Sequence, residues 1–238
     1  MVGVDVEESP DYVDRSICLA DLLLVPSEFV KETLDVAQLR YNDLRVVSFG
    51  ADAQVSISDT FVLNKDSTVI NFMFAGNVNH RKGIMYLLDA WDKLPYSNIR
   101  LIICGRVYKE IQQEIKNRSF SNVSFVGFVN TQEYFKRAHV FVLPTLLEGS
   151  SKAIYEAMSF GLPVITTLNA GSIVEDGKTG CVVPVGNVDA LVESITFFAR
   201  HSDKIKEMGV NALRSVQRYT WDVYAENVVN LYDISVSK

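Results

Sequence analysis

Residues 140–166 read VFVLPTLLEGSSKAIYEAMSFGLPVIT. The stretch opens with an apolar run typical of a buried strand, passes through a short loop, and then places apolar residues at helical spacing between 152 and 160. Gly161 and Pro163 end this helix, and a second β-branched run follows. Strand, helix and strand in this order, with apolar strands that do not alternate, predict a parallel sheet covered by helices on both faces.

The same alternation continues over most of the chain. We predict further strands at 69–75, 99–104, 123–126 and 181–183, and helices at 84–94, 108–117, 131–138, 188–199, 203–218 and 221–232. Right-handed crossovers between parallel strands make this an α/β fold with a doubly wound, Rossmann-like sheet.

The first fifty or so residues follow a different plan. A strand at 21–25 leads to a helix for which Ser27 is the expected N-cap, and a second strand occupies 44–48. The polar stretch from 53 to 67 is typical of a connection. One strand–helix–strand unit cannot bury both of its faces, so we predict that this segment is part of something larger.

Composition and charge limit the possible functions. The chain has 238 residues, 48% of them hydrophobic, which is enough for a substantial core. Its formal charge of -6 gives no global positive field for nucleic acid, so no nucleic-acid partner is expected. The three cysteines lack any Cys/His metal spacing, and no secretory signal or apolar run of membrane-spanning length is visible. We therefore expect a cytoplasmic protein without a metal or cofactor.

The first candidate site follows the strand at 69–75. Gly76 and Asn77 open a loop in which Arg81 and Lys82 stand just before a helix. Backbone amides at a helix N-terminus, together with cationic side chains, suit a phosphate group. A solvated loop whose glycines only turn the chain is the alternative. His80, in the same loop, is either a further phosphate contact or a solvated residue.

The second candidate site follows the strand at 140–143. Glu148 ends the loop, and Glu156 lies about a turn and a half inside the next helix. Between them, Gly149, Ser150 and Ser151 offer amides and hydroxyls at a helix N-terminus. Two carboxylates around an anion site suit a polyhydroxylated anion such as a nucleotide sugar. The alternatives are an acidic first turn favoured by the helix dipole for Glu148 and a solvent-facing charge for Glu156.

The run from Glu148 to Ile165 resembles the E-x7-E signature of family 4 retaining glycosyltransferases. The similarity extends to 74–83, 125–129 and 169–180, in the order and at the spacing of that family. Members have the GT-B fold, in which two Rossmann-like domains face each other across a cleft. The resemblance implies that most of this chain is the C-terminal, donor-binding domain.

The resemblance also implies roles for individual residues. Glu148 would lie beside the hydroxyls of the transferred sugar, and Glu156 would bind the ribose. Lys82 matches the family lysine on the diphosphate. Many members carry an Arg where this chain has Asn77, so Arg81 would have to supply the second positive charge. The amides of 149–151 would meet the diphosphate, and the base would lie near four residues that follow their strands: Gly105, Arg106, Phe128 and Val129.

Family members place an acceptor-binding domain first, and this chain contains little of one. We expect residues 1–52 to be the tail end of that domain, 53–68 a linker, 69–218 the donor domain, and 219–238 a helix that packs back toward the first domain. The implied partners are a UDP-, GDP- or ADP-linked sugar and a saccharide or lipid-linked acceptor, the latter held by a missing domain or a partner subunit. Peripheral membrane association as part of a larger enzyme stays open. So do two alternatives to transfer, a non-catalytic nucleotide-sugar binding module and a protein-interaction module.

Overall fold

The computed structural model describes residues 11–52 and 68–236. Its larger sheet has six parallel strands in the order β5-β4-β3-β6-β7-β8. The strands are β3 (Ile70–Ala75), β4 (Ile99–Cys104), β5 (Val123–Gly127), β6 (Val140–Leu143), β7 (Val164–Thr167) and β8 (Gly180–Val183). This sheet confirms the predicted doubly wound, parallel α/β fold.

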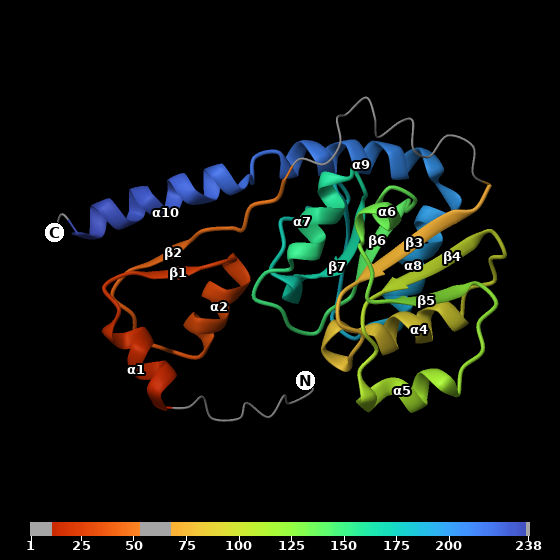
Figure 1. The fold of residues 1–238 in the computed structure, drawn as a ribbon, viewed down its shortest axis with the longest axis horizontal. Helices are drawn as coiled ribbons and strands as arrows, with labels where there is room; N and C mark the ends of the chain where they lie inside the picture. The colour runs from red at the N-terminus through yellow and green to blue at the C-terminus, as the bar shows by residue number, and fades with distance from the viewer. Residues whose placement is uncertain (1–10, 53–67, 237–238) are drawn as a thin grey trace.

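Helices cover both faces of this sheet. They are α4 (Ile84–Asp92), α5 (Lys109–Lys116), α6 (Gln132–Phe135), α7 (Lys152–Ser159), α8 (Val188–Arg200) and α9 (Ser202–Val216). Figure 1 shows α4 and α5 below the sheet, α9 above it and α7 beside β7. Helix α4 packs against α8, and α7 packs against α9. Because both faces are covered, the strand residues of β6 and β7 are all buried, which explains their continuous apolar runs.

Helix α6 is shorter than the predicted 131–138. The chain leaves the helix early, and the His139 amide then donates to the Asn71 carbonyl at 2.8 Å. The Asn71 amide in turn donates to His139 Nδ1 at 3.0 Å. These bonds bring the start of β6 alongside β3, so sheet pairing overrides the local helical pattern.

The order of strands reverses in the middle of the sheet. The chain starts at β3, builds outward through β4 to β5, and then returns to place β6 on the other side of β3. The carboxyl ends of β3 and β6 therefore lie where the strand order reverses, and the loops that follow these two strands border a crevice there. In open parallel sheets, ligands bind at this reversal of strand order.

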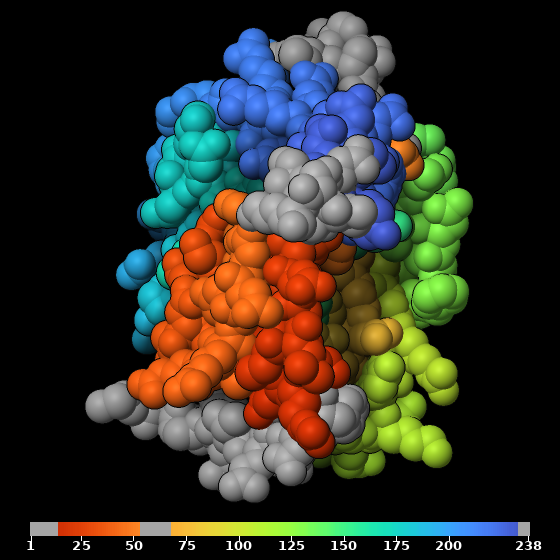
Figure 2. All heavy atoms as spheres, turned by 90° about the vertical axis from the view of Figure 1, so that its left-hand side faces the viewer, coloured from red at the N-terminus to blue at the C-terminus, as the bar shows by residue number. Residues whose placement is uncertain are grey.

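Residues 11–52 form a small unit beside these carboxyl ends. Strands β1 (Leu23–Val25) and β2 (Leu44–Val46) pair in parallel and are accompanied by α1 (Asp11–Leu19) and α2 (Glu28–Val36). Ser27 caps α2 as predicted, because its hydroxyl accepts the Val30 amide. In Figure 2 this unit stands in front of the large sheet, with α10 (Trp221–Val236) above it.

The small unit is connected to the C-terminal helix by aromatic contacts. The Phe49 ring lies 6.5 Å from the Trp221 ring and 6.2 Å from the Tyr224 ring, between centroids. The Ala51 amide donates to the Tyr219 carbonyl at 2.8 Å. Chain entry into the larger sheet and chain exit from it thus lie side by side. The predicted linker at 53–68 falls, except for Thr68, outside the described residues.

Candidate functional site

The crevice has a rigid wall where the loop after β3 meets the loop after β6. The loop after β3 forms a short 3-10 helix, η1 (His80–Lys82), which ends at Gly83 with a φ of +73°. A Cβ on Gly83 would lie 1.9 Å from the Pro144 carbonyl oxygen, so only glycine allows this contact. The Arg81 carbonyl accepts hydrogen bonds from the Leu146 amide at 2.8 Å and the Thr145 hydroxyl at 2.9 Å.

Three charged side chains meet across this wall. Lys82 Nζ lies 2.7 Å from Glu148 Oε1, and an Arg81 Nη1 hydrogen bond reaches the same carboxylate oxygen. Arg81 Nη1 also donates to the Leu147 carbonyl at 3.0 Å. The Lys82 and Glu148 side chains are only 11% and 12% exposed, whereas Arg81 is 49% exposed. The cluster carries a net positive charge in a largely buried place, which favours an anion.

Hydrogen bonds fix the loop that carries Glu148. The Glu148 amide donates to the Asn169 carbonyl at 2.8 Å, and the Asn169 side-chain amide donates back to the Leu146 carbonyl at 2.8 Å. The Ser151 amide donates to the Ala170 carbonyl at 3.1 Å. Residues 168–170, a second short 3-10 helix (η2, Leu168–Ala170), therefore support the loop from behind.

The start of α7 offers unused polar groups. Ser151 is its N-cap by position, but the Ser151 hydroxyl is buried and finds no hydrogen-bond partner among the described residues. Leaving a buried hydroxyl unpaired costs about 1–3 kcal/mol. An anion at this helix N-terminus would receive that hydroxyl as well as the positive end of the helix dipole.

A pocket of about 210 Å³ lies beside this helix start. The pocket lies between α7 and the residues that follow three neighbouring strands, β3, β4 and β5. Its lining includes Gly76, Asn77, Gly105, Phe128, Val129, Thr131, Ala153 and Glu156. Gly105, with a φ of +148°, lets the loops after β3 and β4 touch, because a Cβ there would lie 1.8 Å from the Gly76 carbonyl oxygen.

Glu156 forms one side of this pocket. Burial raises the pKa of its carboxyl, while Lys152, at 3.7 Å, opposes that shift. Glu156 and Thr131 also line a second hollow of about 290 Å³, which runs toward Lys152 and Trp221. This carboxylate, 39% exposed and placed between two hollows, can accept hydrogen bonds from the hydroxyls of a ligand.

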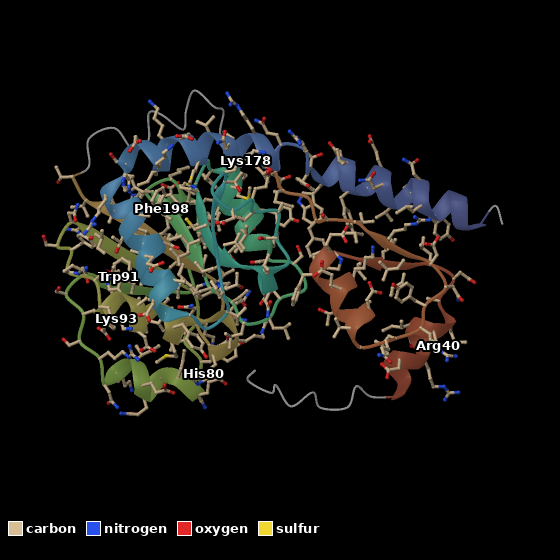
Figure 3. The ribbon with its side chains drawn as sticks, turned by 180° about the vertical axis from the view of Figure 1, so that it is seen from behind. Arg40, His80, Trp91, Lys93, Lys178 and Phe198 are labelled. Atoms are coloured by element: carbon tan, nitrogen blue, oxygen red, sulfur yellow. The ribbon has the colours of Figure 1, made fainter. Side chains whose placement is uncertain are left out.

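Most of the predicted site residues meet in this crevice. Six of them line the 210 Å³ pocket, and Arg81, Lys82 and Glu148 form the adjoining charge cluster. Arg106 is exposed and lines none of the hollows described here. His80 pairs with Glu114 of α5 at 3.6 Å, at the lower edge of Figure 3, rather than with the cluster. Sequence reasoning missed the supporting residues Thr145 and Asn169, because only the folded loops reveal what these polar side chains hold.

The described residues hold neither a metal-binding cluster nor a membrane-spanning helix. Within residues 11–52 and 68–236, no group of three or more His, Cys, Asp or Glu side chains is placed to hold a metal ion. In the same ranges, no helix has the length and apolar character needed to cross a membrane.

Comparison with protein families identifies one match. The family model described as "Glycosyl transferases group 1" matches residues 70–201. Similar curated proteins include an uncharacterised glycosyltransferase of Methanocaldococcus jannaschii, 24% identical over 90% of this chain and 60% of the relative. A phosphatidyl-myo-inositol mannosyltransferase of Mycobacterium leprae is 29% identical over 68% of this chain and 46% of the relative. The chain thus spans about half of the length of such relatives.

Solved structures agree on the fold. Sucrose-phosphate synthase from Thermosynechococcus elongatus superimposes with a TM-score of 0.82 at 21% identity, over 99% of this chain and 64% of that one. Anabaena HepE, solved in complex with UDP and glucose, gives a TM-score of 0.79 at 20% identity, over 93% and 65% of the two chains. These likenesses extend across the described part of this chain and support the predicted GT-B architecture.

Proposed function

The chain belongs to the group 1 glycosyl transferases, and we propose that it supplies the donor-binding half of an enzyme that transfers a sugar with retention. The donor is a nucleoside-diphosphate sugar, and the acceptor is a hydroxyl of a saccharide or lipid-linked saccharide. Because the chain spans only part of its relatives, both substrates and the complete activity belong to this proposal.

One observation carries the proposal: a cationic pair and two carboxylates border the same crevice. Lys82 and Arg81 converge on Glu148, and Glu156 lines the adjoining pocket. A diphosphate supplies anionic oxygens for the cations, and two sugars supply hydroxyls for the carboxylates. A nucleotide sugar combines these groups in one molecule.

The parts of the donor are assigned to successive positions along the crevice. The diphosphate lies between Lys82, Arg81 and the start of α7, where the Ser151 hydroxyl has no hydrogen-bond partner within the described part of the chain. Glu156 accepts the ribose hydroxyls, and the base lies against the pocket wall formed by Gly105 and Val129. The bond from the sugar to the diphosphate breaks as a bond to the acceptor oxygen forms. The two cations stabilise the negative charge on the departing diphosphate.

We place the acceptor outside this crevice, on a part of the enzyme beyond the donor-binding half. A non-catalytic nucleotide-sugar binding module is the alternative, and it predicts binding without transfer. Supplying the chain with an acceptor half from a relative distinguishes the two. Retention is tested by the anomeric configuration of the product, which NMR coupling constants report; an inverted anomer would contradict it.

The binding step is tested first. Thermal unfolding of the full chain is measured with UDP, GDP, ADP and their common sugars, beside Glu156→Ala. A ligand at 100 times its dissociation constant adds about 2.7 kcal/mol to the free energy of unfolding. We expect one nucleotide class to stabilise the protein and to lose most of its effect in Glu156→Ala. Failure of all three classes would overturn the proposed donor site.

A further inference from the structure

Glu148 occupies an anion position between two cations. Its Oε1 accepts from both Lys82 and Arg81, and its side chain is 88% buried by the surrounding loops, being only 12% exposed. Both Nη1 protons of Arg81 are engaged, one by Glu148 and one by the Leu147 carbonyl. The carboxylate therefore offsets part of the positive charge with which Lys82 and Arg81 attract an anion.

From this arrangement we propose that Glu148 is an internal counter-ion that the diphosphate of the donor displaces from Arg81. The inference rests on the proposed donor site and adds a change of partner: Arg81 passes from Glu148 to the diphosphate when the donor binds. A diphosphate and a buried carboxylate repel each other when both face the same cations. Rotation of the Glu148 carboxylate away from Arg81 increases the distance between the two anions and so lowers that repulsion.

The displaced carboxylate keeps Lys82, at 2.7 Å, but loses Arg81, and a buried charge that loses one of its two charged partners is less stable. The hydroxyls of the donor sugar provide a replacement partner, whereas a bare nucleoside diphosphate does not. Glu148 therefore couples occupancy of the phosphate position to recognition of the sugar. It disfavours the nucleotide product, which lacks the sugar, relative to the intact donor.

Glu148→Gln tests the proposal because it keeps the shape and removes the competing charge. The probes are inorganic pyrophosphate, UDP, GDP and ADP, measured by calorimetry on the full chain. We expect pyrophosphate, and whichever nucleotide binds the wild type, to bind about tenfold more tightly to the variant. The corresponding nucleotide sugar should gain less, so the preference for sugar-bearing over bare nucleotide should fall.

Arg81→Ala in both backgrounds separates displacement from simple repulsion. If Arg81 changes partners, its removal should change the pyrophosphate affinity of the wild type little. The substitution removes a phosphate contact from the complex and a Glu148 contact from the free protein, and the two losses offset each other. In the Glu148→Gln background the same removal should weaken pyrophosphate binding about tenfold. Equal losses in both backgrounds would mean that Arg81 keeps its partner, and the proposal would be wrong.

Two controls complete the design. Glu207→Gln makes the same charge change on α9, where Glu207 pairs with Lys204 at 2.6 Å, and it should alter no affinity. If Glu148→Gln does not fold, a crystal structure of the unmodified protein with pyrophosphate decides: a retained Glu148–Arg81 pair overturns the proposal. If pyrophosphate binds but none of the three nucleotides does, the proposed function is contradicted and the inference about Glu148 is not. Binding of no probe by either protein would contradict both.

Discussion

The Ser27 hydroxyl donates a hydrogen bond to the Gly149 carbonyl at 2.5 Å, across 122 positions of sequence. The same hydroxyl accepts the Val30 amide and so caps α2. Gly171 packs against this junction, since a Cβ there would lie 2.7 Å from Ser27 Oγ. The small N-terminal unit is thus joined directly to the loop that carries Glu148.

Ser27→Ala should lower the free energy of unfolding by about 2 kcal/mol, because it removes a helix cap worth about 1 kcal/mol and a buried hydrogen bond of similar value. Urea unfolding measures the change. Thr33→Ala is the matched control, because it also removes a hydroxyl from α2 but at an exposed position. Equal effects of the two substitutions would show that neither the cap nor the Gly149 contact adds to stability.

Much of this architecture could be predicted from sequence because buried parallel strands leave continuous apolar runs. The strand at 140–143 and the Ser27 cap follow from local patterns, and the rule for sheet edges points to Gly76. The expectation that Gly105 and Val129 lie in the same pocket comes from the family resemblance. Contacts between distant loops leave no such pattern. The Arg81–Glu148 pair joins residues 67 positions apart, so only the folded chain reveals it.

Lys82→Ala should weaken binding of the nucleotide class that stabilises the protein by about tenfold to a hundredfold. Its ammonium group is largely buried, and a charge-assisted hydrogen bond of this kind is worth about 1.5–3 kcal/mol. Calorimetry measures the affinity. Lys204→Ala, which removes a lysine from an exposed pair on α9, should leave it unchanged. Unchanged affinity in Lys82→Ala would remove this lysine from the site.

Gly83→Ala should destabilise the protein far more than Gly177→Ala. Both glycines have positive φ, at +73° and +70°, so both substitutions bear a backbone strain of about 1–2 kcal/mol. A Cβ on Gly83 would also meet the Pro144 carbonyl, whereas a Cβ on Gly177 would have no atom of the described residues within 4 Å. We expect a loss of at least about 4 kcal/mol for Gly83→Ala in urea unfolding. Similar losses would mean that the contact between the loops after β3 and β6 relaxes freely.

His139 should make the protein less stable as the pH falls below about 6.5. Burial lowers the pKa of its imidazole from the ordinary 6.5, and Nδ1 already accepts the Asn71 amide. The native state therefore keeps a neutral ring where the unfolded chain binds a proton. Stability is complete above the unfolded pKa and decreases as the pH falls from there toward the lowered native value.

The His139→Asn variant isolates this effect, because the Asn Oδ1 can accept the Asn71 amide without titrating. Between pH 7.5 and pH 5.5, proton uptake by the unfolded wild type contributes at most about 1.4 kcal/mol of destabilisation. Urea unfolding at the two pH values should show a larger decrease for the wild type than for the variant, by up to that amount. A parallel decrease in both proteins would assign the pH dependence to other groups. The native imidazole would then be no harder to protonate than the unfolded one, despite its burial beside Asn71.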